Sequence, residues 1–140
     1  MAALAAALRS ELAGERGADL LLGAQEFPTA GRVVDALADP AALVLVGCLD
    51  DVVVGYARAA VRTLVDGTRV AVVEELGVEP EARAVGVGEA LVGEVLAWAA
   101  DQRCVGVDAP ALPGQRATKN FFEAHGFTAR LLTVHRPVGP

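Results

Sequence analysis

Two adjacent carboxylates and a glycine-rich turn lie close together in residues 74–91, EELGVEPEARAVGVGEAL. A carboxylate can act as a general base. The first amides of a helix lack intrahelical partners and lie at the positive end of the helix dipole, so a glycine-rich turn that leads into a helix can bind a phosphate. Gly86 and Gly88 have this position, and Arg83 adds a charged donor. The segment predicts an anion site beside a general base; a turn whose glycines only permit close packing is the alternative.

In the strand that carries the two carboxylates, the apolar side chains change from odd-numbered to even-numbered positions. Its apolar, core-like positions are Ala71, Val73, Leu76 and Val78. The spacing of three across Glu74 and Glu75 indicates one extra residue, a β-bulge, and bulges occur beside active sites because they re-aim side chains. A regular strand is the alternative, but it would place Glu74 on the apolar face without a partner. We take Glu74 as the first candidate for the catalytic base and Glu75 as the second, against the alternative that both are solvated edge charges.

The elements that must position these residues follow from hydrophobic periodicity. Alternating runs on either side of the Asp66-Gly67 turn signal predict an antiparallel meander, and residues at helical spacing follow Pro80. Residues 18–30 are ambiguous, and DLLLG is compatible with a short strand. The order indicates a mixed sheet with helices packed on it. The expected helices are 2–14, a short one within 29–40 that ends before Pro40, 88–101 and 115–126, and the expected strands are 42–49, 52–64, 69–78, 104–109 and 128–136.

The composition fits a single globular domain over residues 1–140. Apolar residues make up 54% of the chain, which excludes a disordered protein, and a chain of 140 residues buries enough surface for a full core. The formal net charge of −6 argues against non-specific nucleic-acid binding and is compatible with an amine-bearing partner.

The sequence predicts neither a membrane segment nor a metal site. The longest uncharged apolar run, AALVLVGCL, has nine residues and is too short to span a bilayer. Residues 2–14 predict an amphipathic helix rather than a signal peptide. Cys48 and Cys104 lie in apolar runs, so we expect packed thiols in a reducing cytosol and a cytoplasmic protein.

Residues 75–92, ELGVEPEARAVGVGEALV, resemble the signature of the GNAT superfamily of N-acetyltransferases. That signature is a strand ending in Leu-x-Val, a Pro turn, and Arg/Gln-x-x-Gly-x-Gly/Ala at the start of a helix. Arg83, Gly86 and Gly88 match its three defining positions. Residues 119–127, KNFFEAHGF, are similar to the late helix of the family, which usually reads Phe-Tyr-Glu followed by Gly-Phe. The resemblance is clearest over residues 42–136 and implies an α/β (α+β) fold with a mixed, mostly antiparallel central sheet and helices on both faces.

The resemblance also implies an activity. It implies transfer of an acetyl group from acetyl-CoA to a primary amine, by direct attack assisted by a carboxylate or by a water-relayed base. The pyrophosphate of the coenzyme would lie on the amides of residues 84–88, and its pantetheine arm would pair with the strand backbone near residues 76 and 78. The coenzyme-binding residues that it implies are Leu76, Val78, Arg83, Ala84, Val85, Gly86, Val87, Gly88, Gln115 and Phe122.

Several positions depart from the pattern of the family, among them Glu89 in the first turn of the helix and Val72, where some relatives carry their base. Phe122 stands where the family often has a Tyr that protonates the departing thiolate, and Gln115 stands where an Asn often contacts the pantetheine arm. These departures keep a second function open, a non-catalytic acyl-CoA-binding sensor or regulatory domain. An interaction domain whose Gly-x-Gly is only structural is a third alternative, and a homodimer is kept open beside a monomer.

Overall fold

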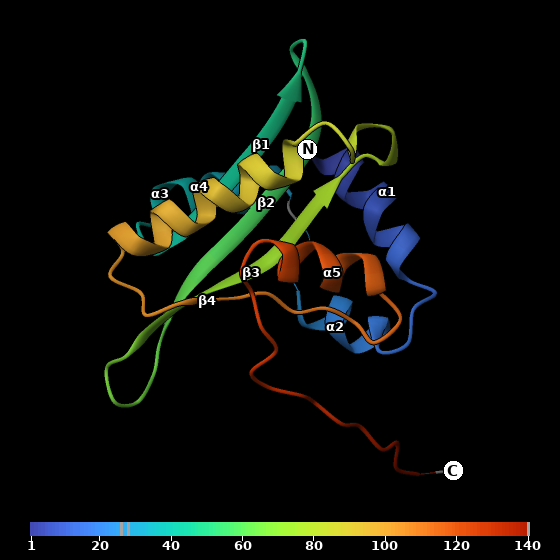
Figure 1. Ribbon diagram of the computed structural model, residues 1–140, viewed down its shortest axis with the longest axis vertical. Coiled ribbons are helices and arrows are strands. Elements are labelled where there is room, and N and C mark those ends of the chain that lie inside the picture. The colour runs from blue at the N-terminus through green and yellow to red at the C-terminus, as the bar shows by residue number, and fades with distance from the viewer. Residues whose placement is uncertain (26, 28, 140) are drawn as a thin grey trace.

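The computed structural model describes residues 1–25, 27 and 29–139, and its centre is one four-stranded sheet in the order β1-β2-β3-β4 (Figure 1). β1 (Ala42–Leu49), β2 (Val52–Thr63) and β3 (Arg69–Val78) pair antiparallel with their neighbours, which confirms the predicted meander. β4 (Val107–Asp108) lies parallel to β3. The sheet is therefore mixed and mostly antiparallel, as predicted.

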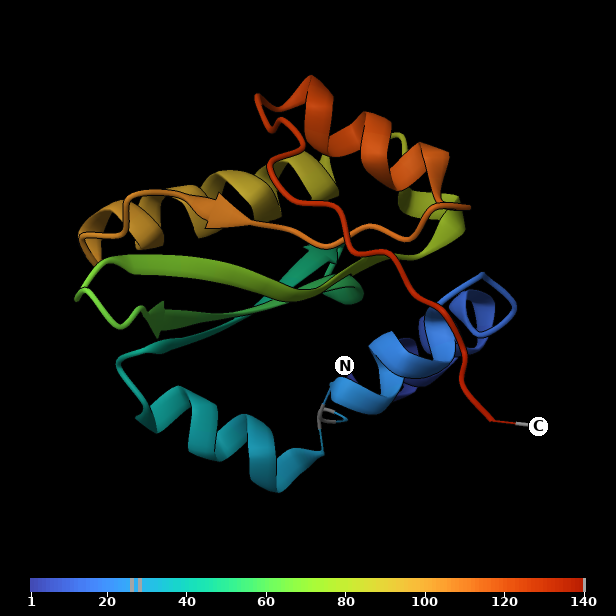
Figure 2. The same ribbon diagram turned by 90° about the horizontal axis from the view of Figure 1, so that it is seen from below.

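The helices cover both faces of this sheet. In Figure 2, α4 and α5 lie above the strands, whereas α1, α2 and α3 lie below them. The predicted helices within 2–14, 29–40, 88–101 and 115–126 are confirmed to within a few residues at their ends. The bounds are α1 Ala2–Leu12, α2 Ala18–Ala24, α3 Ala30–Ala38, α4 Val87–Asp101 and α5 Arg116–Ala124, with a 3-10 turn at Pro80–Ala82.

The main core lies between α4 and the sheet. Burying apolar side chains on this face supplies most of the stabilisation that holds α4 against the strands. The buried residues of the cluster are Val54, Ala57, Ala59, Val73, Val78, Ala82, Val87, Leu91 and Val95. Because Val78 ends β3 and Val87 begins α4, this packing fixes the turn between them.

The short strand considered for DLLLG is wrong, because these residues belong to α2. Asp19 lies in the first turn of that helix, where a negative charge interacts favourably with the helix dipole. Leu21 and Leu22 are half-buried, while Leu20 is 63% exposed. A short apolar run does not by itself distinguish a strand from one buried stripe of a helix.

The last expected strand, residues 128–136, is absent from the structure, where this segment is irregular. The preceding strand is shorter than expected as well, two residues in place of 104–109, and offers only a short edge for pairing. Arg130 contacts Asp108 through its side chain, with 2.7 Å between Nε and Oδ1, and this hydrogen bond lowers the pKa of Asp108. Leu131 and Leu132 remain 75% and 81% exposed.

The two thiols differ in their surroundings. Cys104 is half-buried, but Cys48 is exposed, which corrects the expectation that both are packed. Cys48 follows a register shift between Gly47 and Cys48 in the pairing of β1 with β2. In the part of the chain that the structure describes, no helix is long and apolar enough to cross a membrane.

Candidate active site

The strand β3 contains the predicted bulge, and it lies at Glu74. Arg58 of β2 pairs with Glu75 and Ala59 pairs with Val73, which leaves Glu74 as the extra residue. Val73 before the bulge and Val78 after it are both buried in the α4 core, at 3% and 8% exposed. The extra residue therefore changes the parity of the strand and keeps both apolar halves on the same face.

Glu74 and Glu75, the bulge carboxylates, point to the opposite face, which α1 and α2 cover. Glu75 forms an ion pair with Arg9 of α1, and its side chain is only 7% exposed. Glu74 is 37% exposed and its Oε2 lies 3.3 Å from Arg58 Nη2. Each carboxylate is thus paired with one arginine, but only Glu74 is substantially accessible.

Tyr56 connects to the same cluster from β2. Its side chain is buried; burial first, and then the charge of Glu75, raises the pKa of Tyr56 well above its ordinary value. The phenol therefore stays protonated beside the carboxylate. The second carboxylate oxygen, Glu75 Oε2, is buried and has no hydrogen-bond partner among the described residues.

Arg9 joins α1 to the end of α2 as well as to the bulge. Its guanidinium donates to the carbonyl oxygens of Leu22 at 3.3 Å and Gln25 at 3.4 Å, and lies 5.4 Å from the ring centroid of Phe27. Gln25 in turn donates from Nε2 to the Glu74 carbonyl at 2.6 Å. These bonds hold the α1–α2 wall against the bulge.

Arg9 and Gln25 were not among the predicted site residues. The available signal for Arg9 was an isolated cation next to Leu8 on the apolar stripe of its helix. A buried cation needs a paired anion, but the sequence does not say which one.

One edge of β3 is open beyond its first half. Within the described residues, β4 pairs only with Ala71 and Val72. The Glu79 N–H donates to Val54 of β2 at 2.7 Å, so by alternation the backbone groups of Val78 and Leu76 turn to the open edge. An extended ligand therefore has backbone groups of β3 to pair with at this edge. The predicted pairing of a pantetheine arm near residues 76 and 78 requires such an open edge.

The amides at the start of α4 lie at the end of this open edge. Gly86 is the N-cap of the helix with a φ of 87°, a left-handed conformation that favours glycine, and no side chain among the described residues caps the first turn. A methyl group added at Gly88 would lie 3.2 Å from the Phe121 ring. Gly88 thus allows close packing of α5 on α4, while Gly86 allows the turn that exposes the helix terminus.

Arg83 makes contacts that the sequence did not predict. Its Nη1 and Nη2 donate to the two carboxylate oxygens of Glu11 at 3.1 and 3.0 Å, and its Nε donates to the Val78 carbonyl at 2.9 Å. The guanidinium is therefore held between α1 and the end of β3.

A groove of about 840 Å³, the edge groove, runs past the open edge of β3 and reaches both faces of the sheet. On one side it meets α1 and α2, and on the other it meets the start of α4 and the inner face of α5. Both bulge carboxylates line it. The other predicted residues that line it are Leu76, Val78, Arg83, Ala84, Gly86, Gly88, Gln115 and Phe122.

Two predicted coenzyme residues do not line the edge groove with their side chains. Val85 is 59% exposed, and Val87 is buried in the α4 core at 7% exposed. Only their backbone amides remain candidates for anion binding, because both belong to the segment of residues 84–88 that was predicted from its amides.

The α5 wall is aromatic. Phe122 is 7% exposed, with its ring centroid 5.4 Å from that of Phe121 and 5.1 Å from that of Phe127. Gln115 Oε1 accepts the Leu112 N–H at 3.2 Å, so this side chain orders the turn before α5. His125 also lines the groove, with Nδ1 2.7 Å from the Phe121 carbonyl.

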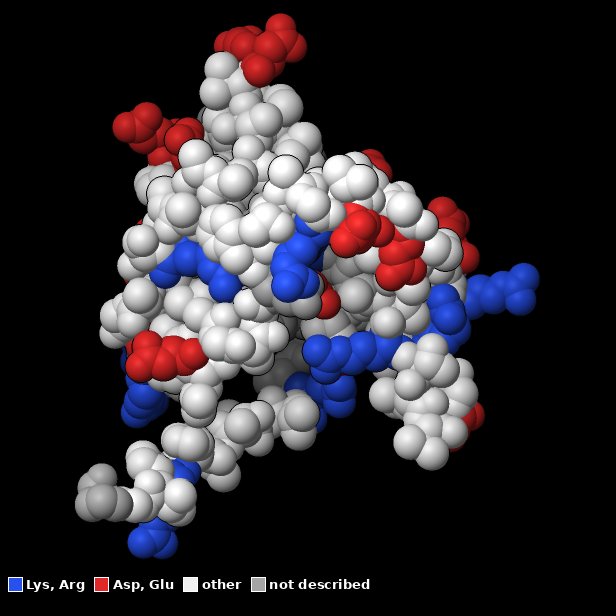
Figure 3. All heavy atoms as spheres, turned by 180° about the vertical axis from the view of Figure 1, so that it is seen from behind, with Lys and Arg blue, Asp and Glu red and all other residues white. Residues whose placement is uncertain are grey.

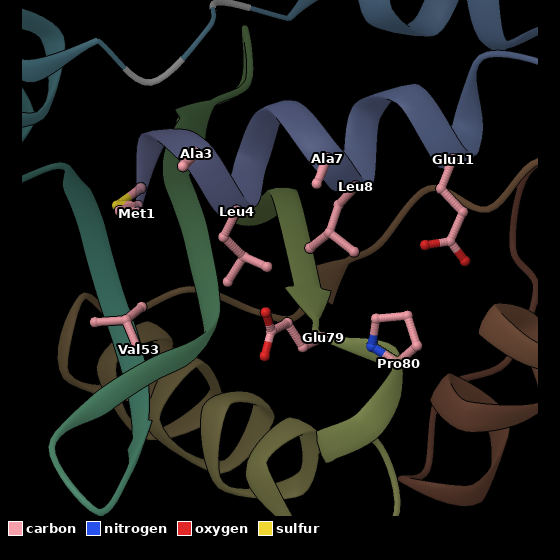
Figure 4. Close-up of a pocket in the computed structure, with 9 residues that line it drawn as sticks. All are labelled: Met1, Ala3, Leu4, Ala7, Leu8, Glu11, Val53, Glu79 and Pro80. Carbon is pink, nitrogen blue, oxygen red and sulfur yellow. The ribbon is translucent and has the colours of Figure 1, made fainter.

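A second, smaller cavity of about 420 Å³ lies between α1 and the ends of the central strands (Figure 4). In Figure 4, Leu4 and Leu8 point from α1 towards the strands, the Glu79 carboxylate lies between Val53 and Pro80, and the Glu11 carboxylate lies at the far end of α1. Its nine lining residues include no Lys or Arg. It is less suited to a phosphate than the edge groove.

The distribution of charge gives no single-sign surface on the face seen in Figure 3. Basic and acidic side chains are interspersed there, and an acidic group covers the tip of the β1–β2 hairpin, which carries Asp50 and Asp51. In the described residues, no group of three or more His, Cys, Asp or Glu could hold a metal ion.

Known proteins resemble this chain in sequence and in structure. The sequence model of the acetyltransferase (GNAT) family matches residues 7–127. No curated protein matches the chain significantly.

Three solved structures illustrate the structural likeness. The BH1408 protein from Bacillus halodurans, as a tetramutant, has a TM-score of 0.80 at 17% identity, over 98% of this chain and 91% of that one. The aminoglycoside antibiotic 6'-N-acetyltransferase from Acinetobacter haemolyticus has a TM-score of 0.66 at 23% identity, over 79% of each chain. AAC(6')-Iy, bound to a bisubstrate analogue of CoA and acetylneamine, has 0.68 at 21%, over 93% and 87%. At these identities the likeness establishes the fold.

Proposed function

The chain belongs to the acetyltransferase (GNAT) family, and we propose that it transfers an acetyl group from acetyl-CoA to a primary amine in the edge groove. The observation that carries this proposal is the course of the groove. It connects the uncapped start of α4, the open backbone edge of β3 and the bulge carboxylates in one continuous surface. We further propose that residues 1–140 act as one domain, because α1 contributes Arg9 and Glu11 to that surface.

The coenzyme is proposed to lie along the open edge of β3. Its pyrophosphate would accept hydrogen bonds from the amides of residues 84–88, where the helix dipole favours negative charge. Its pantetheine arm would pair with the backbone of Leu76 and with the N–H of Val78, whose carbonyl already accepts a hydrogen bond from Arg83 Nε. The structure with a bisubstrate analogue of CoA supports this use of the fold in a relative of similar shape.

Arg83 would then exchange one anion for another. In the structure, the two carboxylate oxygens of Glu11 accept hydrogen bonds from its two terminal nitrogens. A pyrophosphate carries more charge than a carboxylate, and Arg binds both in the same forked geometry. We propose that the pyrophosphate displaces Glu11 from Arg83.

Glu74 is proposed to accept the proton of the attacking amine. It faces the groove, it is accessible, and its contact with Arg58 is long at 3.3 Å. Glu75 is less suited to this role because it is buried and forms an ion pair with Arg9. A buried carboxylate that is already ion-paired is less accessible to an attacking amine than Glu74.

The backbone of β3 would stabilise the charge that develops during transfer. Acetyl-CoA supplies an activated thioester, and its carbonyl oxygen becomes negative as the amine nitrogen attacks the carbonyl carbon. The N–H groups at Leu76 and Val78 turn to the open edge and are the donors that we assign to this oxygen. Phe122 cannot protonate the departing sulfur. An alkyl thiol has a pKa of about 8.5, however, so it can leave as a thiolate without a general acid.

A panel of primary amines tests the proposal by release of free thiol from acetyl-CoA, in parallel with calorimetry of coenzyme binding. Thiol release that depends on amine supports acetyl transfer. Coenzyme binding without thiol release would instead support the second candidate, a non-catalytic acyl-CoA sensor. Two observations favour that candidate: the phenol is missing at Phe122, and Glu11 already occupies Arg83.

A further inference from the structure

The C-terminal end of α1 extends past the end of β3 into the edge groove. A methyl group added at Gly77 of β3 would lie 2.3 Å from Leu8 Cδ1, so α1 packs directly on the strand at this point. About one helical turn further on, Glu11 lines the groove, and Glu15 of the turn after α1 lines it as well. We call residues 11–17 the α1 strap.

The α1 strap contacts the opposite wall of the edge groove through Glu11 and Glu15. Glu11 accepts two hydrogen bonds from Arg83, at 3.1 and 3.0 Å. Glu15 lies against Gly114, where an added methyl group would be 2.1 Å from Glu15 Oε2. Arg83 and Gly114 both line the groove, in the turns before α4 and α5. The strap therefore joins the two walls across the open edge of β3.

The strap is held firmly at its flanks but lightly between them. Before it, the side chain of Arg9 is only 16% exposed in its ion pair, and after it Ala18 is fully buried. The side chains of Glu11 and Arg83 are 52% and 47% exposed, and exposed ion pairs contribute little to stability. Gly17 has a φ of 84° and gives the turn a backbone freedom that other residues lack. The strap can therefore move while its flanks stay in place.

We propose that the α1 strap is the lid of the coenzyme site. It releases from the turns before α4 and α5 to admit acetyl-CoA, and it closes again over the bound pantetheine arm. This inference rests on the proposed position of the coenzyme. The pyrophosphate takes the place of Glu11 at Arg83, while Glu15 returns to Gly114 when the lid closes. Bound coenzyme then leaves only when the lid opens.

A chemical lock tests the lid. Glu15→Cys and Gly114→Cys are combined with Cys48→Ala and Cys104→Ala, which remove the two native thiols, and dibromobimane joins the new thiols and becomes fluorescent. The ligand is desulfo-CoA, which has no thiol to react. Protein locked after loading should retain it during gel filtration that removes it from the unlocked protein. Protein locked before loading should take it up at least about tenfold more slowly than the unlocked protein.

The two orders of addition control for damage to the site. Both yield the same cross-linked protein, so a lock that only distorted the groove would lose the ligand in both orders. Retention after loading together with exclusion before loading is the result that a lid predicts.

A single substitution should loosen the lid. Gly114→Ala places a methyl group against the Glu15 carboxylate and displaces it, and the φ of Gly114 is not in the left-handed region, so alanine fits the backbone. The dissociation rate of desulfo-CoA should rise at least about threefold, measured by surface plasmon resonance. Gly93→Ala in α4, where an added methyl group meets nothing within 4 Å, is the control and should leave the rate unchanged.

The outcomes separate this inference from the proposed function. If desulfo-CoA enters the locked protein as fast as the unlocked one, or leaves protein locked after loading, the strap is not a lid, while amine-dependent thiol release by the parent still supports acetyl transfer. If the lock traps the ligand but the parent releases no thiol with any amine, the lid is supported and the proposed catalysis is wrong. Absence of bimane fluorescence, or of binding to the unlocked protein, overturns the inference.

Discussion

Arg83 and Glu11 form a two-fold hydrogen-bonded ion pair, with distances of 3.1 and 3.0 Å, between the turn before α4 and the N-terminal helix. The contact places a carboxylate where we propose that the coenzyme pyrophosphate lies. It also connects the turn before α4 to α1, which carries Arg9, the ion-pair partner of Glu75. Binding of the coenzyme and the position of α1 should therefore be coupled.

The first prediction concerns this ion pair. Glu11→Gln removes a negative charge that competes with pyrophosphate for Arg83, so the affinity for acetyl-CoA should rise. Arg83→Glu should weaken it by about 1–3 kcal/mol, the range of a charge-assisted hydrogen bond. Calorimetry measures both, and Glu94→Gln, an equal charge change on the exposed face of α4, serves as the control. Equal affinities in all four proteins would rule out the pyrophosphate assignment.

The second prediction concerns the base. Glu74→Gln should lower turnover by roughly 10²-fold, the effect of losing a positioned general base, and should leave coenzyme affinity nearly unchanged. Thiol-release kinetics give the turnover and calorimetry gives the affinity. If Glu75→Gln slows turnover and Glu74→Gln does not, the base has been assigned to the wrong neighbour. If neither variant is slower, the proton passes to water.

The third prediction concerns Phe122. Phe122→Tyr is nearly isosteric and supplies a phenol that can protonate the departing thiolate, so kcat should rise several-fold with little change in coenzyme affinity. The comparison is made by steady-state thiol release with the best amine. A tyrosine variant no faster than the parent would mean that departure of the thiolate is not limiting, or that residue 122 is packed away from the sulfur.

The fourth prediction uses the fact that the chain has a single tyrosine. Burial, and then the charge of Glu75, raises the pKa of Tyr56 above its ordinary value of 10.0. A raised pKa stabilises the folded protein fully below the unfolded value, and this contribution is lost as pH rises through the folded value. Phenolate absorbance should therefore appear at higher pH in the folded protein than in the urea-unfolded chain.

A control variant identifies the cause of that shift. In Glu75→Gln the negative charge is absent, so the folded-state titration should move to lower pH than in the parent protein, while the burial of the phenol keeps it above the unfolded value. Coincident titrations of the folded and unfolded parent would contradict the buried contact between Tyr56 and Glu75.

Local patterns in the sequence were sufficient for the parts of the fold that repeat regularly. The meander and α4 follow from periodicity, and the bulge follows from the change of spacing between Val73 and Leu76, because a strand has only two faces. The DLLLG segment could not be assigned because its short apolar run fits a helix stripe and a strand equally. Residues 128–136 alternate like a strand, but pairing requires a partner edge, and β4 is too short to provide one.

The candidate site was predictable only where a motif carries it. Residues 83–88 predict an anion site because the turn, its glycines and the start of the helix follow one another directly in the sequence. The contacts of Glu75 with Arg9, and of Arg83 with Glu11, join residues 66 and 72 positions apart. No spacing rule connects such residues, because tertiary packing of α1 on the sheet brings them together.

The most direct test of the central claim is the identification of the product after incubation of the protein with acetyl-CoA and the panel of primary amines. For the best amine, mass spectrometry should detect the N-acetylated product in an amount equal to the thiol released, and Glu74→Gln should form it roughly 10²-fold more slowly. If acetyl-CoA binds in the edge groove but no amide forms from any primary amine of the panel, the claim of acetyl transfer at the open edge of β3 is contradicted.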